Sequence, residues 1–258
     1  MSRYPFRTAL VTGASSGIGE AMVEILDAAG VATVVVARRA DRLEALAARL
    51  DRVEVLAADL TTIDGVVAVG TRIADVDRPI DLVVNNAGFG TSGDFHALNV
   101  DRLTDEIDLN VRALTQLSHF ALEAMVSRQR GWLLNVSSVV SFQPAPTLAV
   151  YAATKAYVTS LTESLHEEVR GHGVSVTALC PGLTRTEFQS VSNLANDPGS
   201  YPSFAWADAH DVARYGLDSV ARNRAVAVPG ALYKALVTGS ALTPRPLARR
   251  LAGLARNR

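Results

Sequence analysis

The chain has 258 residues, of which 48% are hydrophobic and 20% are charged, so it can bury a substantial core within one α/β domain and its composition excludes a disordered protein. Its formal net charge of −1 excludes the basic surface of a nucleic-acid-binding protein, and a single cysteine, Cys180, excludes an internal disulfide. The five histidines show no metal-ligand spacing and the N-terminus resembles no signal peptide, so we expect a cytoplasmic protein that binds neither a metal nor nucleic acid.

The first predicted elements are a strand over residues 8–12, a glycine-rich turn over 13–19 and a helix that begins near Ala21. Glycines let the backbone approach a ligand closely, and the free amides of a helix N-terminus attract an anion. The spacing Gly-x-x-x-Gly-x-Gly therefore predicts a phosphate-binding turn. Its members are Gly13, Ser15, Ser16, Gly17, Ile18 and Gly19.

The second predicted strand, residues 31–37, is followed by Arg38 and Arg39. A dinucleotide-binding fold selective for NAD usually has an acidic residue here, on the ribose 2′-hydroxyl. A carboxylate would repel a 2′-phosphate, whereas a guanidinium can bind one. The sequence therefore favours NADP(H) over NAD(H) as cofactor; the alternative is that both arginines only open the exposed helix 41–50.

The third and fourth predicted strands, residues 53–60 and 80–88, also end in candidate ligand contacts. Ligands of open α/β sheets bind at the carboxyl ends of strands, so Asp59 either reaches the adenine or caps the next helix. Small residues after the fourth strand suit a backbone that passes close to a cofactor. The further candidates at these two strand ends are Leu60, Asn86, Ala87 and Gly88.

A long helical pattern over residues 100–128 contains Asn110 in its middle. Asparagine is unfavourable inside a helix because its side chain competes for backbone hydrogen bonds. Asn110 therefore indicates either a local kink or a functional carbonyl.

A strand over residues 132–138 ends at Ser138, and a helix over 151–170 begins with Tyr151 and Lys155. Residues four apart on a helix share one face. An ammonium about 4 Å from a phenol favours the phenolate by roughly 4 kcal/mol at an effective dielectric of about 20, which is about three pKa units. We therefore expect Lys155 to lower the pKa of Tyr151 and Ser138 to lie beside it, in a site that transfers protons to or from a carbonyl or alcohol.

The last third of the chain contains a strand ending at Pro181, a final strand over 225–229 and two irregular regions. Residues 187–209 form a long loop that we assign to the substrate. Residues 243–258 form a basic extension with five arginines, in which Leu247, Leu251 and Leu254 share a helical face. We expect this extension to pack on the domain or on a second subunit, with contact to a membrane surface as the alternative.

Together these motifs resemble the short-chain dehydrogenase/reductase family in its compact single-domain form, over residues 6–230. The motifs that carry the resemblance are Thr12-Gly-Ala-Ser-Ser-Gly-Ile-Gly19, Asn85-Asn-Ala-Gly88, Asn110, Ser138, Tyr151-x-x-x-Lys155 and Pro181-Gly182. The resemblance implies one Rossmann-like domain over residues 1–258, with a doubly wound parallel sheet of about seven strands in a three-layer α/β/α arrangement. It also implies a homodimer or homotetramer that pairs the helices 100–128 and 151–170.

The resemblance implies a catalytic role for Asn110, Ser138, Tyr151 and Lys155. Tyr151 would be the general acid or base, Ser138 would hold the substrate oxygen, and Lys155 would bind the nicotinamide ribose. The backbone carbonyl of Asn110 would anchor a water of the proton relay. Four residues after the sixth strand would complete the cofactor contacts: Pro181, Gly182, Thr184 and Thr186.

These inferences predict an NADP(H)-dependent oxidoreductase that interconverts a small ketone or aldehyde with its alcohol. Among enzymes, the alternative is a 3-oxoacyl-thioester reductase. The non-enzymatic alternative is a nucleotide-sensing protein on the same fold, which the presence of all four catalytic side chains disfavours.

Overall fold

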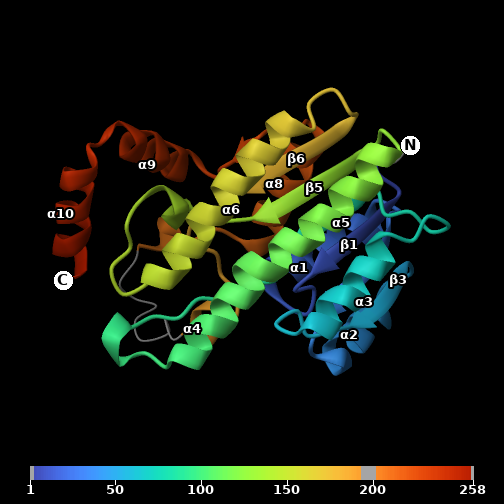
Figure 1. Ribbon diagram of the computed structural model, residues 1–258, viewed down its shortest axis with the longest axis horizontal. Coiled ribbons are helices and arrows are strands. Elements are labelled where there is room, and N and C mark those ends of the chain that lie inside the picture. The colour runs from blue at the N-terminus through green and yellow to red at the C-terminus, as the bar shows by residue number, and fades with distance from the viewer. Residues whose placement is uncertain (1–2, 193–201, 257–258) are drawn as a thin grey trace.

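A computed structural model of the protein describes residues 3–192 and 202–256. Within these ranges one parallel sheet has seven strands in the order β3-β2-β1-β4-β5-β6-β7 (Figure 1). The strands are β1 (Thr8–Thr12), β2 (Ala32–Ala37), β3 (Val53–Ala57), β4 (Leu82–Asn85), β5 (Gly131–Val136), β6 (Val174–Leu179) and β7 (Val226–Ala227). The predicted Rossmann-like sheet is therefore confirmed.

Helices cover both faces of the sheet, which gives the expected three layers. One face is covered by α1 (Gly17–Ala28), α2 (Ala40–Ala47) and α8 (Ala209–Ala221), which share one apolar core with the strands. The other face is covered by α3 (Ile63–Ile73), α5 (Leu114–Ser127) and α6 (Ala149–Glu168), which lie in front of the strands in Figure 1 and form a second core. The strands are continuous apolar runs because both of their faces are buried.

The order of the strands fixes the position of a ligand site. Strand β1 pairs with β2 on one side and with β4 on the other, so the chain builds the sheet outward in both directions from β1. The loops that leave the carboxyl ends of β1 and β4 consequently diverge and leave a crevice between them. The glycine-rich turn follows β1 and the Asn86–Gly88 stretch follows β4, so both predicted cofactor segments meet at this crevice.

The helix predicted over residues 100–128 is interrupted in its middle. It consists of α4 (Val100–Ile107), a π-helical turn η2 (Asp108–Ala113) and α5. Asn110 lies inside the π-helical turn and is fully buried. The irregularity predicted at this position is confirmed, and π-turns of this kind are often found at functional sites.

The substrate loop and the segment after β7 contain helices that were not predicted, whereas the C-terminal extension is helical as expected. The described parts of 187–209 include the short helix α7 (Phe188–Val191) and the 3-10 turn η4 (Ser203–Ala205), whereas residues 193–201 lie outside the described residues. Strand β7 is followed by α9 (Ala231–Leu242) and α10 (Arg245–Arg256), which extend to one side of the sheet in Figure 1. Leu247 is half exposed, and the side chains of Leu251 and Leu254 lie outside what the structure describes. In the described part of the chain, no helix combines the length and the apolar character needed to cross a bilayer.

Candidate active site

The turn after β1 has a shape that requires glycine. Gly13 and Gly17 have φ angles of +67° and +60°, in the left-handed region that glycine adopts without strain. A Cβ added at Gly19 would lie 2.4 Å from the carbonyl oxygen of Gly13, and one at Gly13 would lie 2.9 Å from the Cα of Ala87. The turn is therefore closed so tightly on itself and on the end of β4 that side chains are excluded.

The N-terminus of α1 presents polar groups above this turn. The first intrahelical hydrogen bond runs from the Glu20 amide to the Ser16 carbonyl at 3.4 Å, so the amides before Glu20 precede the helical pattern. The Arg39 guanidinium donates to the hydroxyls of Ser15 (3.0 Å) and Ser16 (3.2 Å). Backbone amides, hydroxyls and a guanidinium together make a site suited to phosphate groups. Ile18 is partly buried and packs against the core.

The ends of β1 and β4 are joined by Thr12, which sequence analysis did not select as a site residue. Its hydroxyl accepts hydrogen bonds from the backbone amides of Asn86 and Ala87, both at 3.0 Å. The Asn86 side chain donates in return to the carbonyl of Thr12 at 2.9 Å and to that of Gly13 at 3.2 Å. The position of a hydroxyl residue at the end of β1, directly before the first glycine, was the available signal.

Arg38 and Asp59 lie at the ends of β2 and β3. Arg38 Nη1 is 3.9 Å from Asp59 Oδ2, and both side chains are exposed. The other Asp59 oxygen accepts from the amide and hydroxyl of Thr61 at 3.0 and 2.8 Å. Thr62, which accepts from the Gly65 amide at 3.1 Å, caps α3, so the capping alternative for Asp59 is wrong. Leu60, beside Asp59, is buried in the core.

Tyr151 and Lys155 lie in the first turns of α6 and are buried together. Tyr151 is 8% exposed and Lys155 is 4% exposed. Lys155 Nζ donates to the carbonyl of Val136 at 2.9 Å and lies 5.7 Å from the centre of the Tyr151 ring. Ser138, two residues after the end of β5, lies close enough to the Tyr151 phenol to act on its pKa. The structure thus brings together the three side chains that the sequence grouped.

The direction of the tyrosine pKa differs from the prediction. Burial raises the pKa of Tyr151 above its usual range, and the Ser138 hydroxyl only partly offsets this. Burial also lowers the pKa of Lys155, to about 8. The expectation that Lys155 lowers the pKa of Tyr151 is wrong for these side chains, because the ammonium faces the Val136 carbonyl and desolvation opposes both charged forms.

Asn110 lies behind this group and holds the segment that follows β4. Its side-chain amide donates to the carbonyl of Phe89 at 2.8 Å and to the Thr154 hydroxyl at 3.1 Å, while its oxygen accepts from the Phe89 amide at 3.2 Å. A Cβ at Gly88 would lie 2.8 Å from the same Asn110 oxygen. Thr154, which was not predicted as a site residue, donates to the carbonyl of Tyr151 at 2.8 Å and so links Asn110 to the first turn of α6.

The segment after β6 runs back across the glycine-rich turn and Tyr151. The Pro181 carbonyl accepts from the Val139 amide at 2.9 Å, and a Cβ at Gly182 would lie 2.1 Å from the ring of Tyr233 on α9. The Thr184 hydroxyl donates to the Gly182 carbonyl at 3.1 Å, and the methyl group of Thr186 lies 2.9 Å from a Cβ built on Gly17.

Two aromatic contacts hold this segment in place. The Phe188 ring packs against the Tyr151 ring with their centres 5.3 Å apart. The Tyr233 hydroxyl accepts from the Leu183 amide at 3.1 Å and donates to the Ala205 carbonyl at 2.8 Å. Neither Phe188 nor Tyr233 was predicted as a site residue, because their contacts depend on how α7 packs against Tyr151 and how α9 packs against the segment after β6.

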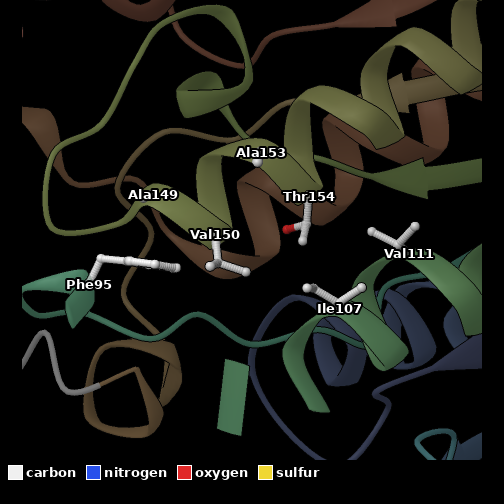
Figure 2. Close-up of a pocket in the computed structure, with 7 residues that line it drawn as sticks. All are labelled: Phe95, Ile107, Val111, Ala149, Val150, Ala153 and Thr154. Carbon is white, nitrogen blue, oxygen red and sulfur yellow. The ribbon is translucent and has the colours of Figure 1, made fainter. Parts of the chain in front are cut away.

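A separate hollow lies outside this group, on the surface between α4–η2 and α6. It has a volume of about 370 Å³ and almost entirely apolar walls. Figure 2 shows side chains of α6 facing those of α4 and η2 across it, with Phe95 of the 3-10 turn η1 (Phe95–Ala97) at one end. The lining residues are Phe95, Ile107, Val111, Ala149, Val150, Ala153 and Thr154. Because Ser138 and Tyr151 do not line it, this hollow is distinct from the buried group of Tyr151, Lys155 and Ser138.

Comparison with known proteins identifies the family. Residues 7–197 match the short chain dehydrogenase family. An uncharacterised oxidoreductase of Staphylococcus epidermidis is 35% identical over 193 residues, which are 72% of this chain and 81% of the relative.

Two solved structures have the same fold over almost the whole chain. A short-chain dehydrogenase from Sphingobium yanoikuyae in complex with NADPH is 34% identical, with a TM-score of 0.81, and the match covers 90% of this chain and 92% of that one. A bulky-bulky ketone specific alcohol dehydrogenase from Comamonas testosteroni is 31% identical, with a TM-score of 0.78 and 92% of each chain covered. The glycine-rich turn, the buried group of Tyr151, Lys155 and Ser138, and these similarities agree: the chain belongs to the short-chain dehydrogenase/reductase family of oxidoreductases.

Proposed function

We propose that the protein interconverts a ketone or aldehyde and the corresponding alcohol, with NADP(H) as its cofactor. The observation that carries this proposal is the burial of Tyr151, Ser138 and Lys155 as one group at the carboxyl edge of the sheet. A buried phenol that contacts a hydroxyl and lies near an amine has the proton donor and the hydrogen-bond donor that a reacting carbonyl oxygen requires.

The raised pKa of Tyr151 suits the reductive direction. A phenol that keeps its proton at neutral pH can donate it to the oxygen of a carbonyl substrate, while the Ser138 hydroxyl donates a hydrogen bond to the same oxygen. When bound, the reduced nicotinamide supplies the hydride. Lys155 would hold the adjoining ribose through Nζ, and Asn110 fixes the backbone at Phe89 beside them.

The residues around the glycine-rich turn fit a dinucleotide phosphate. The tight packing at Gly13 and Gly19 holds the turn against the end of β4, and Arg39 joins the Ser15 and Ser16 hydroxyls beside it. The NADPH complex of the Sphingobium relative and the bound NADP of a putative gluconate 5-dehydrogenase from Beutenbergia cavernae support the same cofactor for this chain. Asp59 and Arg38 would then lie beside the adenosine.

The preference for NADP(H) can be tested with two matched variants. Arg39→Met removes a guanidinium that touches the phosphate-binding turn, whereas Arg38→Met removes one that is 65% exposed and reaches only Asp59 among the ion pairs of the described residues. We expect Arg39→Met to weaken NADPH binding by roughly tenfold to a hundredfold and NADH binding by much less, because a charge-assisted bond to phosphate is worth about 1.5–3 kcal/mol. Equal losses for the two cofactors would contradict the preference.

The substrate class can be tested by following the oxidation of NADPH with a panel of ketones, aldehydes and acetoacetyl thioesters. We expect turnover with free ketones or aldehydes. Turnover with thioesters alone would favour a 3-oxoacyl-thioester reductase, and tight NADPH binding without turnover on any substrate would favour a nucleotide-sensing protein.

The apolar face between α4–η2 and α6 is the proposed interface with a second copy of the chain. Two exposed apolar side chains line the hollow of Figure 2, Phe95 (62% exposed) and Ile107 (46%), and Val100 (70%) is exposed at the start of α4. A face of this kind on two long helices suits self-association. Ile107→Glu is expected to shift the protein toward monomer in sedimentation, and an unchanged oligomeric state would contradict this interface.

A further inference from the structure

The carboxylate of Glu187 accepts hydrogen bonds from the two arginines beside the phosphate-binding turn, Arg39 and Arg42. Glu187 comes directly before α7, and its oxygens accept from Arg42 at 2.7 and 2.9 Å and from Arg39 at 3.1 Å. All three side chains are accessible, with 42% of each arginine and 44% of the glutamate exposed. The contacts therefore lie at the surface of the molecule, where a dissolved anion can reach them.

Arg39 faces two partners at once. One of its terminal nitrogens donates to the hydroxyls of Ser15 and Ser16, and the other donates to Glu187. Arg42 follows in the first turn of α2, which begins next to Arg39. Glu187 of the substrate loop and the two serines of the phosphate-binding turn thus share the guanidinium of Arg39.

We propose that Glu187 is a cofactor-selectivity residue that competes with the 2′-phosphate of NADP(H) for Arg39 and Arg42, and so limits the preference for NADP(H) over NAD(H). This inference rests on the proposed function, because it requires a 2′-phosphate that binds at these arginines.

The negative charge of Glu187 determines which cofactor it disfavours. The hydrogen bonds from Arg42 and Arg39 hold the pKa of Glu187 below its usual range, so the carboxylate is charged at neutral pH. A 2′-phosphate that approaches Arg39 must displace this carboxylate or lie beside it, and both cost binding free energy. A 2′-hydroxyl carries no charge and meets no such competition. Ion pairs between exposed side chains are weak, so an incoming phosphate can displace them.

The test compares two nucleotides that lack the nicotinamide. Adenosine 2′-monophosphate and adenosine 5′-monophosphate are titrated calorimetrically into the native protein and into Glu187→Gln, which keeps the size of the side chain and removes its charge. We expect Glu187→Gln to bind adenosine 2′-monophosphate about three- to tenfold more tightly, since exposed ion pairs contribute up to about 1 kcal/mol each and about 1.4 kcal/mol is tenfold. Binding of adenosine 5′-monophosphate is expected to change by less than about twofold.

Glu54→Gln is the matched control. Glu54 is also 44% exposed and also pairs with two arginines, Arg72 at 3.0 Å and Arg78 at 3.6 Å, but it lies near the amino end of β3, away from the phosphate-binding turn. This variant loses the same charge and a comparable pair of contacts. We expect it to bind both nucleotides as the native protein does.

Two results would overturn the inference. An unchanged affinity for adenosine 2′-monophosphate in Glu187→Gln would mean that no competition occurs. A weaker affinity would mean that Glu187 instead orients the arginines for the phosphate. If the native protein binds the two nucleotides equally and Arg39→Met changes the affinity for neither, then the proposed NADP(H) preference fails as well. This result separates a failure of the proposed cofactor preference from a failure of the Glu187 inference alone.

Discussion

Replacement of Lys155 by methionine should stabilise the protein while abolishing the proposed turnover. Burial lowers the pKa of Lys155 from 10.5 to about 8, so keeping this amine charged inside the folded protein at pH 7 costs about 3 kcal/mol, at about 1.36 kcal/mol for each pKa unit. Methionine has a similar length and carries no charge. It loses the hydrogen bond from the ammonium to the Val136 carbonyl, which is worth about 1.5–3 kcal/mol because the donor is charged. The expected gain in the free energy of unfolding is therefore about 0.5–2 kcal/mol.

The gain in the free energy of unfolding from Lys155→Met should decrease as the pH rises. Between about pH 8 and pH 10.5 the unfolded chain binds more protons at Lys155 than the folded chain does, so the stability of the native protein rises with pH in this window. The advantage of Lys155→Met should therefore be present at pH 7 and fade as the pH rises through the window.

Urea denaturation at several pH values measures this difference. The chain's other lysine, Lys234, is exposed on α9 with its ammonium 5.3 Å from the centre of the Tyr215 ring, so Lys234→Met should lower stability by no more than about 1 kcal/mol, with no change between about pH 8 and pH 10, and serves as the control. A Lys155→Met variant that is less stable than the native protein at pH 7, or whose advantage grows with pH, would refute this reasoning.

Three further changes test other parts of the site. Gly19→Ala puts a Cβ 2.4 Å from a backbone oxygen. It should therefore weaken dinucleotide binding in a fluorescence titration by at least about tenfold and lower the free energy of unfolding by about 1–3 kcal/mol. Native-like binding would contradict the tight turn. Tyr233→Phe removes the hydroxyl that bridges the Leu183 amide and the Ala205 carbonyl. It should lower the free energy of unfolding in urea by about 1 kcal/mol and raise the KM for the cofactor without moving the pH profile of turnover. A shifted profile would place Tyr233 in the proton transfer instead. Deletion of residues 244–258 should change sedimentation or lipid pelleting and leave the pH profile of turnover unchanged; an altered profile would mean that the extension acts on the catalytic group.

Much of the fold could be predicted because its signals are local. Continuous apolar runs separated by helical patterns indicate a parallel sheet covered on both faces, and the glycine spacing marks the turn after β1. Asn110 in the middle of a helix was sufficient to predict an irregular turn there, and the structure has a π-helical turn at Asp108–Ala113. The grouping of Ser138 with Tyr151 and Lys155 followed from one strand end and one helix start.

The remaining features depend on contacts between distant segments. The pKa of Tyr151 depends on how completely Phe188 and the surrounding loops exclude water, which the spacing of Tyr151 and Lys155 does not report. The choice of Arg39, and not Arg38, as the partner of Ser15 and Ser16 depends on side-chain orientation at the end of β2.

The helix α9 was also not predicted. Its Tyr233 ring covers Gly182, a contact that exists only once the chain has returned over the sheet. Burial and long-range packing, which no short motif encodes, account for these differences.

Tyr151→Phe tests the central claim most directly, because it removes one hydroxyl from a ring that is already packed against Phe188. NADPH affinity, measured by fluorescence titration, should change by less than about threefold, while turnover of a carbonyl substrate should fall by about a hundredfold to ten-thousandfold, the range expected when a general acid is lost. A folded Tyr151→Phe variant that binds NADPH and reduces the substrate at the native rate would contradict the assignment of Tyr151 as the proton donor.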